Sequence, residues 1–351
     1  MPREETSNLE SNLEAIEDPM VANVFPQLND RDLAALSQTC RFFRDLTSEQ
    51  RKQRQFNELI RRVVCGEEKE AKAMLESAPT LLLGTGRAFD YSRRTVQATP
   101  FQATLCAGDV EMCQMMMTIA KQHNMEGELQ AQFEAIFPNG VESLAEQQQQ
   151  NTFDFDPIVA AITNASDADH QAALNKENNG SALCQALDAF REQFAGLSRE
   201  ETVFNPTHLL TAFERYDQEF DQWWNFGQRD LFWRQVVGYV QCFLPACYAQ
   251  AFAQGIYYIV EQNEVLKRTF TFRFNSFTTY LPCFDGRSGL GFDFVSLVGT
   301  LGDDASWRGL RRYEGEKGAG APFQNYVSKK YQALAEIYST AASAAIPCGP
   351  Q

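Results

Sequence analysis

Nine cysteines and three histidines are the side chains of this 351-residue chain that could supply nucleophilic chemistry. A cysteine nucleophile needs a neighbouring histidine or other cation that lowers the pKa of its thiol. Two histidines have no such role, because His123 follows an expected helix end and His170 lies in a polar segment. His208 could in principle serve Cys242 or Cys247, but both lie in a stretch without charged side chains, where buried inert thiols are common. We therefore expect no thiol catalysis.

Metal and cofactor sites also need closely spaced residues. Zinc sites usually combine two pairs of cysteine or histidine ligands. The closest pairs here are Cys106 with Cys113 and Cys242 with Cys247, and neither has a second pair of similar type. The glycines within 286–291 neither follow a strand nor open a helix, as a dinucleotide-binding loop would require. The sequence predicts no metal and no cofactor.

One acidic segment needs a separate comparison. Glu314-Gly315-Glu316, with Ser276, Thr278 and Thr279 upstream, partly resembles the Glu-x-Glu and serine-threonine motifs of ADP-ribosyltransferases. The segment 311–317 mixes both signs of charge, which is typical of a solvated loop. No convincing first arginine precedes the set, so we expect a loop rather than a catalytic site.

The elements that would position any site belong to an acidic chain. The net charge of -15 and the pI near 4.8 argue against nucleic acid or anionic lipid as the main partner, because both require clustered lysine and arginine. The odd number of scattered cysteines favours reduced thiols in a cytosol. The charged N-terminus has no apolar core, so we expect no signal peptide.

A long stretch without charged side chains lies between Arg234 and Glu261, and it is long enough to cross a bilayer. Several glutamines interrupt it, and Pro245 divides it, which in lipid would leave main-chain groups unpaired. We predict two buried helices joined at Pro245 and no membrane span.

The segment 20–46 carries strong helix signals. Asn29 suits the N-cap of a helix that begins near Asp30, and Asp32 lies where a carboxylate answers the cap. Apolar residues three or four apart then predict one stripe on one helix, formed by Leu33, Leu36, Cys40 and Phe43. Upstream, the helix-start signature Asp18-Pro19 precedes a second apolar stripe of Val21, Val24, Phe25 and Leu28.

This pattern resembles an F-box, the adaptor motif that docks on Skp1 in cullin-type ubiquitin ligases. The family form matches Val24-Phe25, Leu28, the turn 29–31, Asp32-Leu33 and the segment 40–43 without a gap after Leu28. The opening leucine-proline of the family is Ile16-Glu17 here, and the closing tryptophan is missing. The resemblance implies a three-helix module over 16–55, and its core and its Skp1-binding face together comprise Val24, Phe25, Leu28, Leu33, Leu36, Cys40 and Phe43. The alternative is an ordinary helical hairpin inside a larger domain.

A helical region follows over 56–137. The segment Thr99–Gln102 should open a helix, and Gly108 lets the chain reverse into a second helix at the spacing of an ankyrin repeat. A weaker copy has its turn at Gly66, farther upstream than the ankyrin period of about 33 residues. The region therefore resembles two degenerate ankyrin repeats with an insertion in Ser77–Gln97. The alternative is an unrelated helical bundle.

The insertion is expected to be a loop that combines aromatic and arginine side chains, the types that contribute most energy at protein interfaces. We predict that it binds a target protein through Phe89, Tyr91, Arg93 and Arg94. Equally, Phe89 and Tyr91 could pack internally while Arg94 caps main-chain carbonyls.

The polar segment 138–151 is the predicted linker, and 152–351 the predicted C-terminal domain. Apolar spacing there predicts helices at 158–162, 183–194 and 208–224, the hairpin at Pro245, and a last helix at 325–343. Alternation in Thr269–Phe274 predicts a strand, and Phe277–Leu281 is also β-prone. After an acidic leader, 1–15, the expected fold is mainly α with a small β element.

This organisation resembles type IV secreted effectors of Legionella and related intracellular bacteria. The resemblance implies a virulence protein secreted into the host cell cytoplasm, where it links a Skp1-like protein of a cullin ubiquitin ligase to an unknown target protein. Such an adaptor needs no catalytic residues of its own. Two alternatives remain: an effector enzyme that modifies a host protein through its C-terminal domain, and a plain ankyrin-type protein-binding inhibitor.

Overall fold

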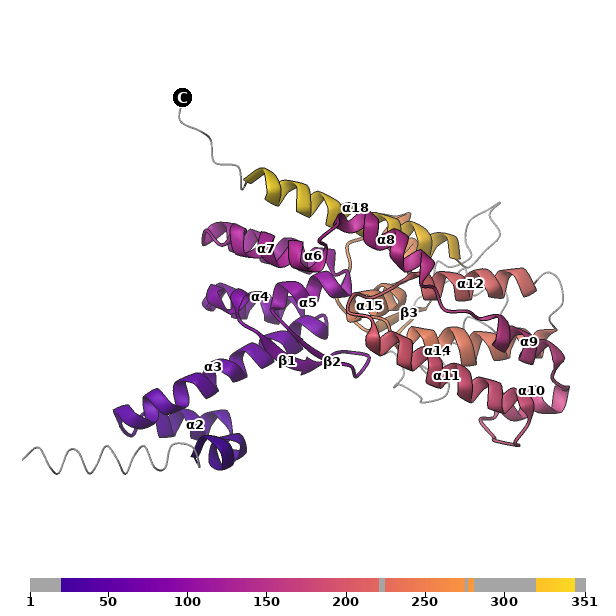
Figure 1. Ribbon diagram of the computed structural model, residues 1–351, viewed down its shortest axis with the longest axis horizontal. Coiled ribbons are helices and arrows are strands. Elements are labelled where there is room, and N and C mark those ends of the chain that lie inside the picture. Colours follow the sequence, from indigo (N-terminus) through magenta and orange to yellow (C-terminus); the bar gives the residue numbers. More distant parts are fainter. Residues whose placement is uncertain (1–19, 221–224, 275–276, 281–319, 345–351) are drawn as a thin grey trace, which may run out of the picture.

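The computed structural model describes residues 20–220, 225–274, 277–280 and 320–344. Over these residues the chain is mainly helical, as the sequence predicts. Figure 1 shows an elongated arrangement, with α2 (Asp30–Ser37) at one end, α10 (Asp167–Leu174) at the other, and α18 (Gly320–Ala344) along one long side. The expected leader 1–15 and the acidic segment 314–316 lie outside the described residues.

Two short helical turns, Met20–Val24 (η1) and Phe25–Gln27 (η2), precede α2. The side-chain oxygen of Asn29 accepts a hydrogen bond from the main-chain N–H of Asp32 at 2.9 Å. Asn29 also donates through Nδ2 to the Asp32 carboxylate at 2.7 Å. The predicted helix start is therefore confirmed.

The expected single helix that would carry Leu33 and Phe43 on one stripe is wrong. α2 ends at Ser37, the backbone at Cys40 is extended, and α3 (Arg41–Val64) begins after it. Leu33 therefore lies on α2 and Phe43 on α3. The stripe is divided between two helices that pack against each other.

α3 is also the first helix of the next unit, so the two predicted modules share it. The other helices of this unit are α4 (Glu68–Ser77), α5 (Pro100–Ala107), α6 (Val110–Gln122) and α7 (Glu126–Ile136). Thr99 and Gln102 form the capping box that opens α5. The chain reverses after α3 at Gly66 (φ 71°) and after α5 at Gly108 (φ 64°), backbone conformations that favour glycine. The predicted helical hairpins are present, with α5 packed between α3 and α7.

The segment expected to be a loop between these hairpins is only partly irregular. A helical turn, Pro79–Leu83 (η3), is followed by two antiparallel strands, β1 (Gly86–Phe89) and β2 (Thr95–Ala98). Arg93, at φ 65°, occupies the left-handed position that a three-residue hairpin loop uses. The strands are four residues each, too short to give a clear alternating pattern.

The polar segment 138–151 is not an irregular linker, because Gly140–Gln150 form helix α8. Val141 and Gln148 are its buried side chains. With so few apolar residues, the segment lacks the stripe by which a helix is predicted.

The C-terminal region is helical as expected, and its helices are α9 (Asp156–Asn164), α10, α11 (Ala182–Glu200), α12 (Thr207–Phe220), α13 (Phe226–Phe232), η4 (Trp233–Val237), α14 (Gly238–Gln241), α15 (Ala246–Gln254) and α16 (Ile256–Val260). The chain turns at Pro245 into α15, whose residues are all buried, which confirms the predicted buried hairpin. Within the described ranges, no helix is long and apolar enough to span a membrane. The predicted strand is β3 (Thr271–Phe274), which pairs antiparallel with β4 (Phe277–Tyr280).

Helix α15 lies against the turns of both helical hairpins. The Gln250 amide donates to the main-chain carbonyl of Gly66 at 3.1 Å. The Tyr248 hydroxyl lies 3.2 Å from the position that a Cβ atom would take at Gly108. The helical hairpins and the C-terminal helices are therefore in direct contact.

Helix α18 joins the two hydrophobic cores of the molecule. Phe323 and Tyr326 pack among the C-terminal helices, whereas Leu334 and Ile337 pack with α3 to α8. The helix begins at Gly320, five residues before the expected start at 325, and Pro322 belongs to its first turn. One helix thus contributes to both cores.

Candidate functional site

The structure separates the predicted Skp1-binding residues by burial. Phe25 and Leu33 are completely buried and belong to the core of the N-terminal module. Val24 is 37% exposed, and the neighbouring Val21 is 39% exposed. The remaining predicted residues are half-buried (Leu28, Leu36 and Phe43) or exposed (Cys40). The apolar residues of this module therefore include both a core and an accessible set.

Arg54 on α3 fastens the N-terminal turns in place. Its Nη2 donates to the main-chain carbonyls of Phe25 at 2.8 Å and Leu28 at 2.7 Å. Its Nη1 forms an ion pair with Asp30 at 2.7 Å. Hydrogen bonds from a charged donor are stronger than neutral ones, so Arg54 holds the accessible apolar residues on a defined backbone. Sequence reasoning missed Arg54, because no local pattern links it to partners more than twenty residues upstream.

The predicted target-binding residues all lie on the β1–β2 hairpin but differ in their surroundings. Phe89 is 68% exposed, and Arg93 is exposed too. Tyr91 stacks on Phe270, with ring centroids 4.4 Å apart. Arg94 is paired with Asp90 at 2.9 Å, and its Nη1 donates to the carbonyl of Ser198 at 3.4 Å. Phe89 and Arg93 are therefore exposed, whereas Tyr91 and Arg94 attach the hairpin to the C-terminal region.

A cavity of about 270 Å³ lies between this hairpin and the C-terminal helices. Strand β2 and helices α3 and α5 line one side, and the ends of α11 and α15 line the other. Its apolar lining includes Val63, Ala103, Ala107, Pro245 and Ala246. Residues from such distant parts of the chain form no sequence motif, so the sequence offered no signal for this site.

Buried charges cross the same boundary. Asp109, the N-cap of α6, is 3% exposed and receives two hydrogen bonds from Arg268, at 2.7 and 2.5 Å. Burial acts to raise the pKa of the Asp109 carboxyl, but the charge and hydrogen bonds of Arg268, the charge of Lys330 and the hydrogen bond from the Met112 N–H together outweigh it and hold this pKa below its usual value. Lys330 of α18 is paired with Glu111 at 3.2 Å. These pairs lock the helical hairpins to the C-terminal region.

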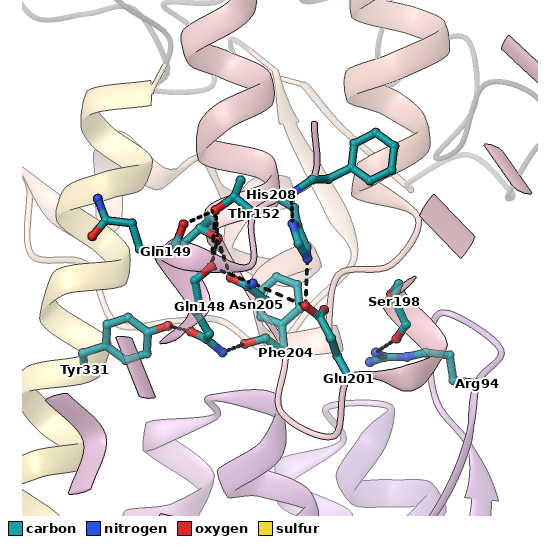
Figure 2. A network of polar contacts seen from close by, with 12 residues as sticks. Arg94, Gln148, Gln149, Thr152, Ser198, Glu201, Phe204, Asn205, His208 and Tyr331 are labelled. Atoms are coloured by element: carbon teal, nitrogen blue, oxygen red, sulfur yellow. Dashed lines mark hydrogen bonds and ion pairs between the residues drawn. The ribbon is translucent and has the colours of Figure 1, made fainter. Parts of the chain in front are cut away.

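A second polar network, shown in Figure 2, joins α8, α12 and α18. Gln148 lies at its centre, donating to the carbonyl of Phe204 at 3.0 Å and accepting from the Tyr331 hydroxyl. His208 accepts from the main-chain N–H of Phe153 at 3.1 Å through Nδ1, so its Nε2 carries the proton donated to Glu201 at 2.9 Å. Both ring nitrogens of His208 therefore have structural partners.

The Cys-His arrangement considered from the sequence has no active thiol. Burial raises the pKa of the Cys242 thiol to about 12, and that of Cys247 to about 12. The Cys247 thiol donates to the carbonyl of Ala107 at 3.7 Å. Both thiols are therefore protonated at neutral pH, and His208 is occupied elsewhere. Over the described ranges, no group of three histidine, cysteine or carboxylate side chains is placed to hold a metal ion.

The chain matches no protein-family model, no curated protein and no solved structure. Its candidate sites are therefore defined by their own geometry: the accessible apolar residues of the N-terminal module, and the hairpin with the cavity beside it.

Proposed function

We propose that this protein is a non-catalytic adaptor that binds a Skp1-like subunit through its N-terminal module and a target protein through the hairpin region. The observation that carries the proposal is the division of the F-box-like residues between a core and an accessible set. Phe25 and Leu33 are completely buried in the module, whereas Val24 is exposed and Leu28 is half-buried.

Docking would bury the remaining exposed parts of these apolar side chains. Full burial of an exposed side chain of this kind contributes about 1.5 to 3 kcal/mol. Val24 is 37% exposed and Leu28, Leu36 and Phe43 are half-buried, so each would contribute a fraction of that amount and offset part of the cost of association. In keeping with the resemblance of the chain to type IV secreted effectors, the proposed setting is a host cytoplasm, where the host ligase supplies the chemistry.

The ankyrin-like character of the helical hairpins belongs to the same proposal. Glycine turns at Gly66 and Gly108, the capping box at Thr99, and a β-hairpin between successive helix pairs all favour it. In such an arrangement a projecting hairpin is a natural place for a target to bind.

The binding test requires a variant that alters the surface and preserves the core. Leu33→Asp is unsuitable, because Leu33 is completely buried and a charge there would unfold the module. Val24→Asp places the charge on an accessible residue instead. We expect co-purification with a purified Skp1-like protein to fall by at least about tenfold, the effect of roughly 1.4 kcal/mol.

Val265→Asp is the matched control, since this valine is 82% exposed and lies far along the chain in the C-terminal region. It should leave co-purification unchanged. Equal binding by the two variants would exclude the proposed docking surface. If the chain binds a target but no Skp1-like protein, the plain inhibitor would be favoured.

A further inference from the structure

The closing turn of the β1–β2 hairpin determines which main-chain groups point to its two outer edges. The N–H of Asp90 donates to the carbonyl of Arg94 at 2.8 Å, so these residues form a hydrogen-bonded pair. Bonded and non-bonded pairs alternate along an antiparallel ladder. Two pairs therefore turn their main-chain N–H and C=O groups outward: Phe89 with Thr95, and Arg87 with Gln97.

The edge of β1 lies against α3 and is covered at Arg87. The outward N–H of Arg87 donates to the side-chain oxygen of Asn57 on α3 at 2.8 Å. The edge of β2 differs, because the outward groups of Thr95 and Gln97 have no hydrogen-bond partner in the described part of the chain. Both residues are exposed. Among the described residues, β2 therefore has an unpaired strand edge.

That edge borders the cavity of about 270 Å³. All four residues of β2, from Thr95 to Ala98, line it. Successive side chains of a strand point to opposite faces, so four in a row can line one cavity only if the strand's edge borders it. Beneath the edge, Ala103 and Ala107 of α5 provide an apolar floor, and Ala246 lies on the facing side.

We propose that the edge of β2 binds an extended peptide segment of a partner protein as a third strand, with one apolar side chain of that peptide in the cavity. Main-chain hydrogen bonds to Thr95 and Gln97 supply affinity, and the cavity supplies the side-chain preference. The strand edge and the cavity adjoin each other, so one bound peptide can contact both.

The lining of the cavity identifies the side chain as uncharged. Of the charged residues that line it, Arg94 is paired with Asp90, Asp109 with Arg268 and Glu201 with His208. Arg199 and Glu200 line it from exposed positions at the end of α11. No buried unpaired charge is therefore available to compensate a charged ligand, and burying one would be costly. The volume of about 270 Å³ is large enough for one leucine-sized or aromatic side chain.

This inference deepens the target-binding half of the proposed function, and its test involves no Skp1-like protein. A phage-displayed library of random peptides is selected on the full chain, and the enriched peptides are synthesised. We expect a shared pattern of one apolar residue between residues that favour strands. On binding, hydrogen exchange at the Thr95 and Gln97 amides should slow, because these N–H groups become bonded.

Two substitutions at one position separate the main chain from the side chain. Gln97→Pro removes the outward N–H without touching the β1–β2 bonds, and should weaken peptide binding about tenfold. Gln97→Ala keeps the N–H and should bind as the native protein does. Ala107→Leu, which fills part of the cavity, should weaken binding while circular dichroism shows an unchanged fold.

The proposal is overturned if no peptide is enriched, or if enriched peptides bind the Gln97→Pro protein as tightly as the native one. It is likewise overturned if bound peptide leaves exchange at Thr95 and Gln97 unchanged. The Val24→Asp test leaves β2 intact, so each of the two proposals can fail without the other.

Discussion

Arg268 and Asp109, 159 positions apart, form a bidentate ion pair in which both guanidinium Nη atoms donate to the carboxylate, at 2.7 and 2.5 Å. Asp109 caps α6, and Arg268 lies between α16 and β3, so the pair joins the helical hairpins to the C-terminal region. Arg268 also donates to Glu68 at 2.7 Å. Arg268 thus binds carboxylates at the N-terminal ends of α4 and α6.

Replacing this arginine should be strongly destabilising. Arg268→Met leaves the buried Asp109 carboxylate without its partner, and such losses cost about 3 to 5 kcal/mol. Unfolding in urea, followed by circular dichroism, measures the change. The double variant Arg268→Met with Asp109→Asn removes the unpaired charge and should be more stable than Arg268→Met alone. An Arg268→Met protein as stable as the native one would show that the pair contributes little.

The same pair predicts a loss of stability in acid. The pKa of the Asp109 carboxyl is depressed in the folded protein, so its stabilising contribution is fully present above the unfolded pKa of about 3.9. That contribution is lost as pH falls through the lower folded value. Urea unfolding at pH about 6 and about 3 should show a smaller acid loss for the Asp109→Asn protein than for the native one. Equal acid losses would contradict this assignment.

The core and surface assignment in the N-terminal module can be tested by stability. Leu33→Ala should destabilise by about 2 to 5 kcal/mol, because Leu33 is completely buried. Val24→Ala should change stability by less than about 0.5 kcal/mol, because Val24 is accessible. Thermal unfolding of both variants checks the pair. Similar losses in the two variants would mean that Val24 belongs to the core.

Thiol labelling should divide the cysteines by environment. Cys40 is exposed and should react rapidly with iodoacetamide. Burial raises the pKa of Cys106 to about 11 and that of Cys247 to about 12, so these thiols should react slowly at neutral pH. Peptide mapping by mass spectrometry identifies each site, and labelling in denaturant provides the reference. Rapid labelling of native Cys247 would contradict its burial.

Replacement by alanine should change the stability of the protein in opposite directions at two glycines. Gly108 has φ 64°, and a Cβ atom there would lie 3.2 Å from the Tyr248 hydroxyl. Gly108→Ala should therefore destabilise by about 1 to 2 kcal/mol. Gly127, on α7, has no atom within 4 Å of its would-be Cβ, so Gly127→Ala should stabilise by about 0.5 to 1 kcal/mol. Thermal unfolding compares the two.

Local signals predicted local structure well. Asn29, Thr99 and Gly108 act on residues within one helical turn, and each has the predicted role. The break at Cys40 was missed because the apolar spacing continues across it from one helix into the next. Helix α8 was not predicted because it has no stripe of apolar residues. Its buried side chains are Val141 and Gln148.

The candidate sites were predictable to different degrees. The sequence pattern predicts the apolar residues of the N-terminal module as one set. Only their burial in the structure distinguishes Phe25, which is in the core, from Val24, which is exposed. The open edge of β2 depends on which hairpin pairs are bonded, and the cavity on helices that meet only in the folded chain. Such tertiary relationships leave no trace in residue spacing.

The position of α18 in both cores has a consequence for biosynthesis. Its residues Phe323 and Ile337 belong to separate cores, so neither core is complete until α18 has been synthesised. The apolar side chains that pack against α18, such as Tyr248 and Phe252 beside Phe323, therefore stay uncovered on that side until then. Chaperone association during synthesis is the expected result, while the short N-terminal module, fastened by Arg54, can fold early on its own contacts.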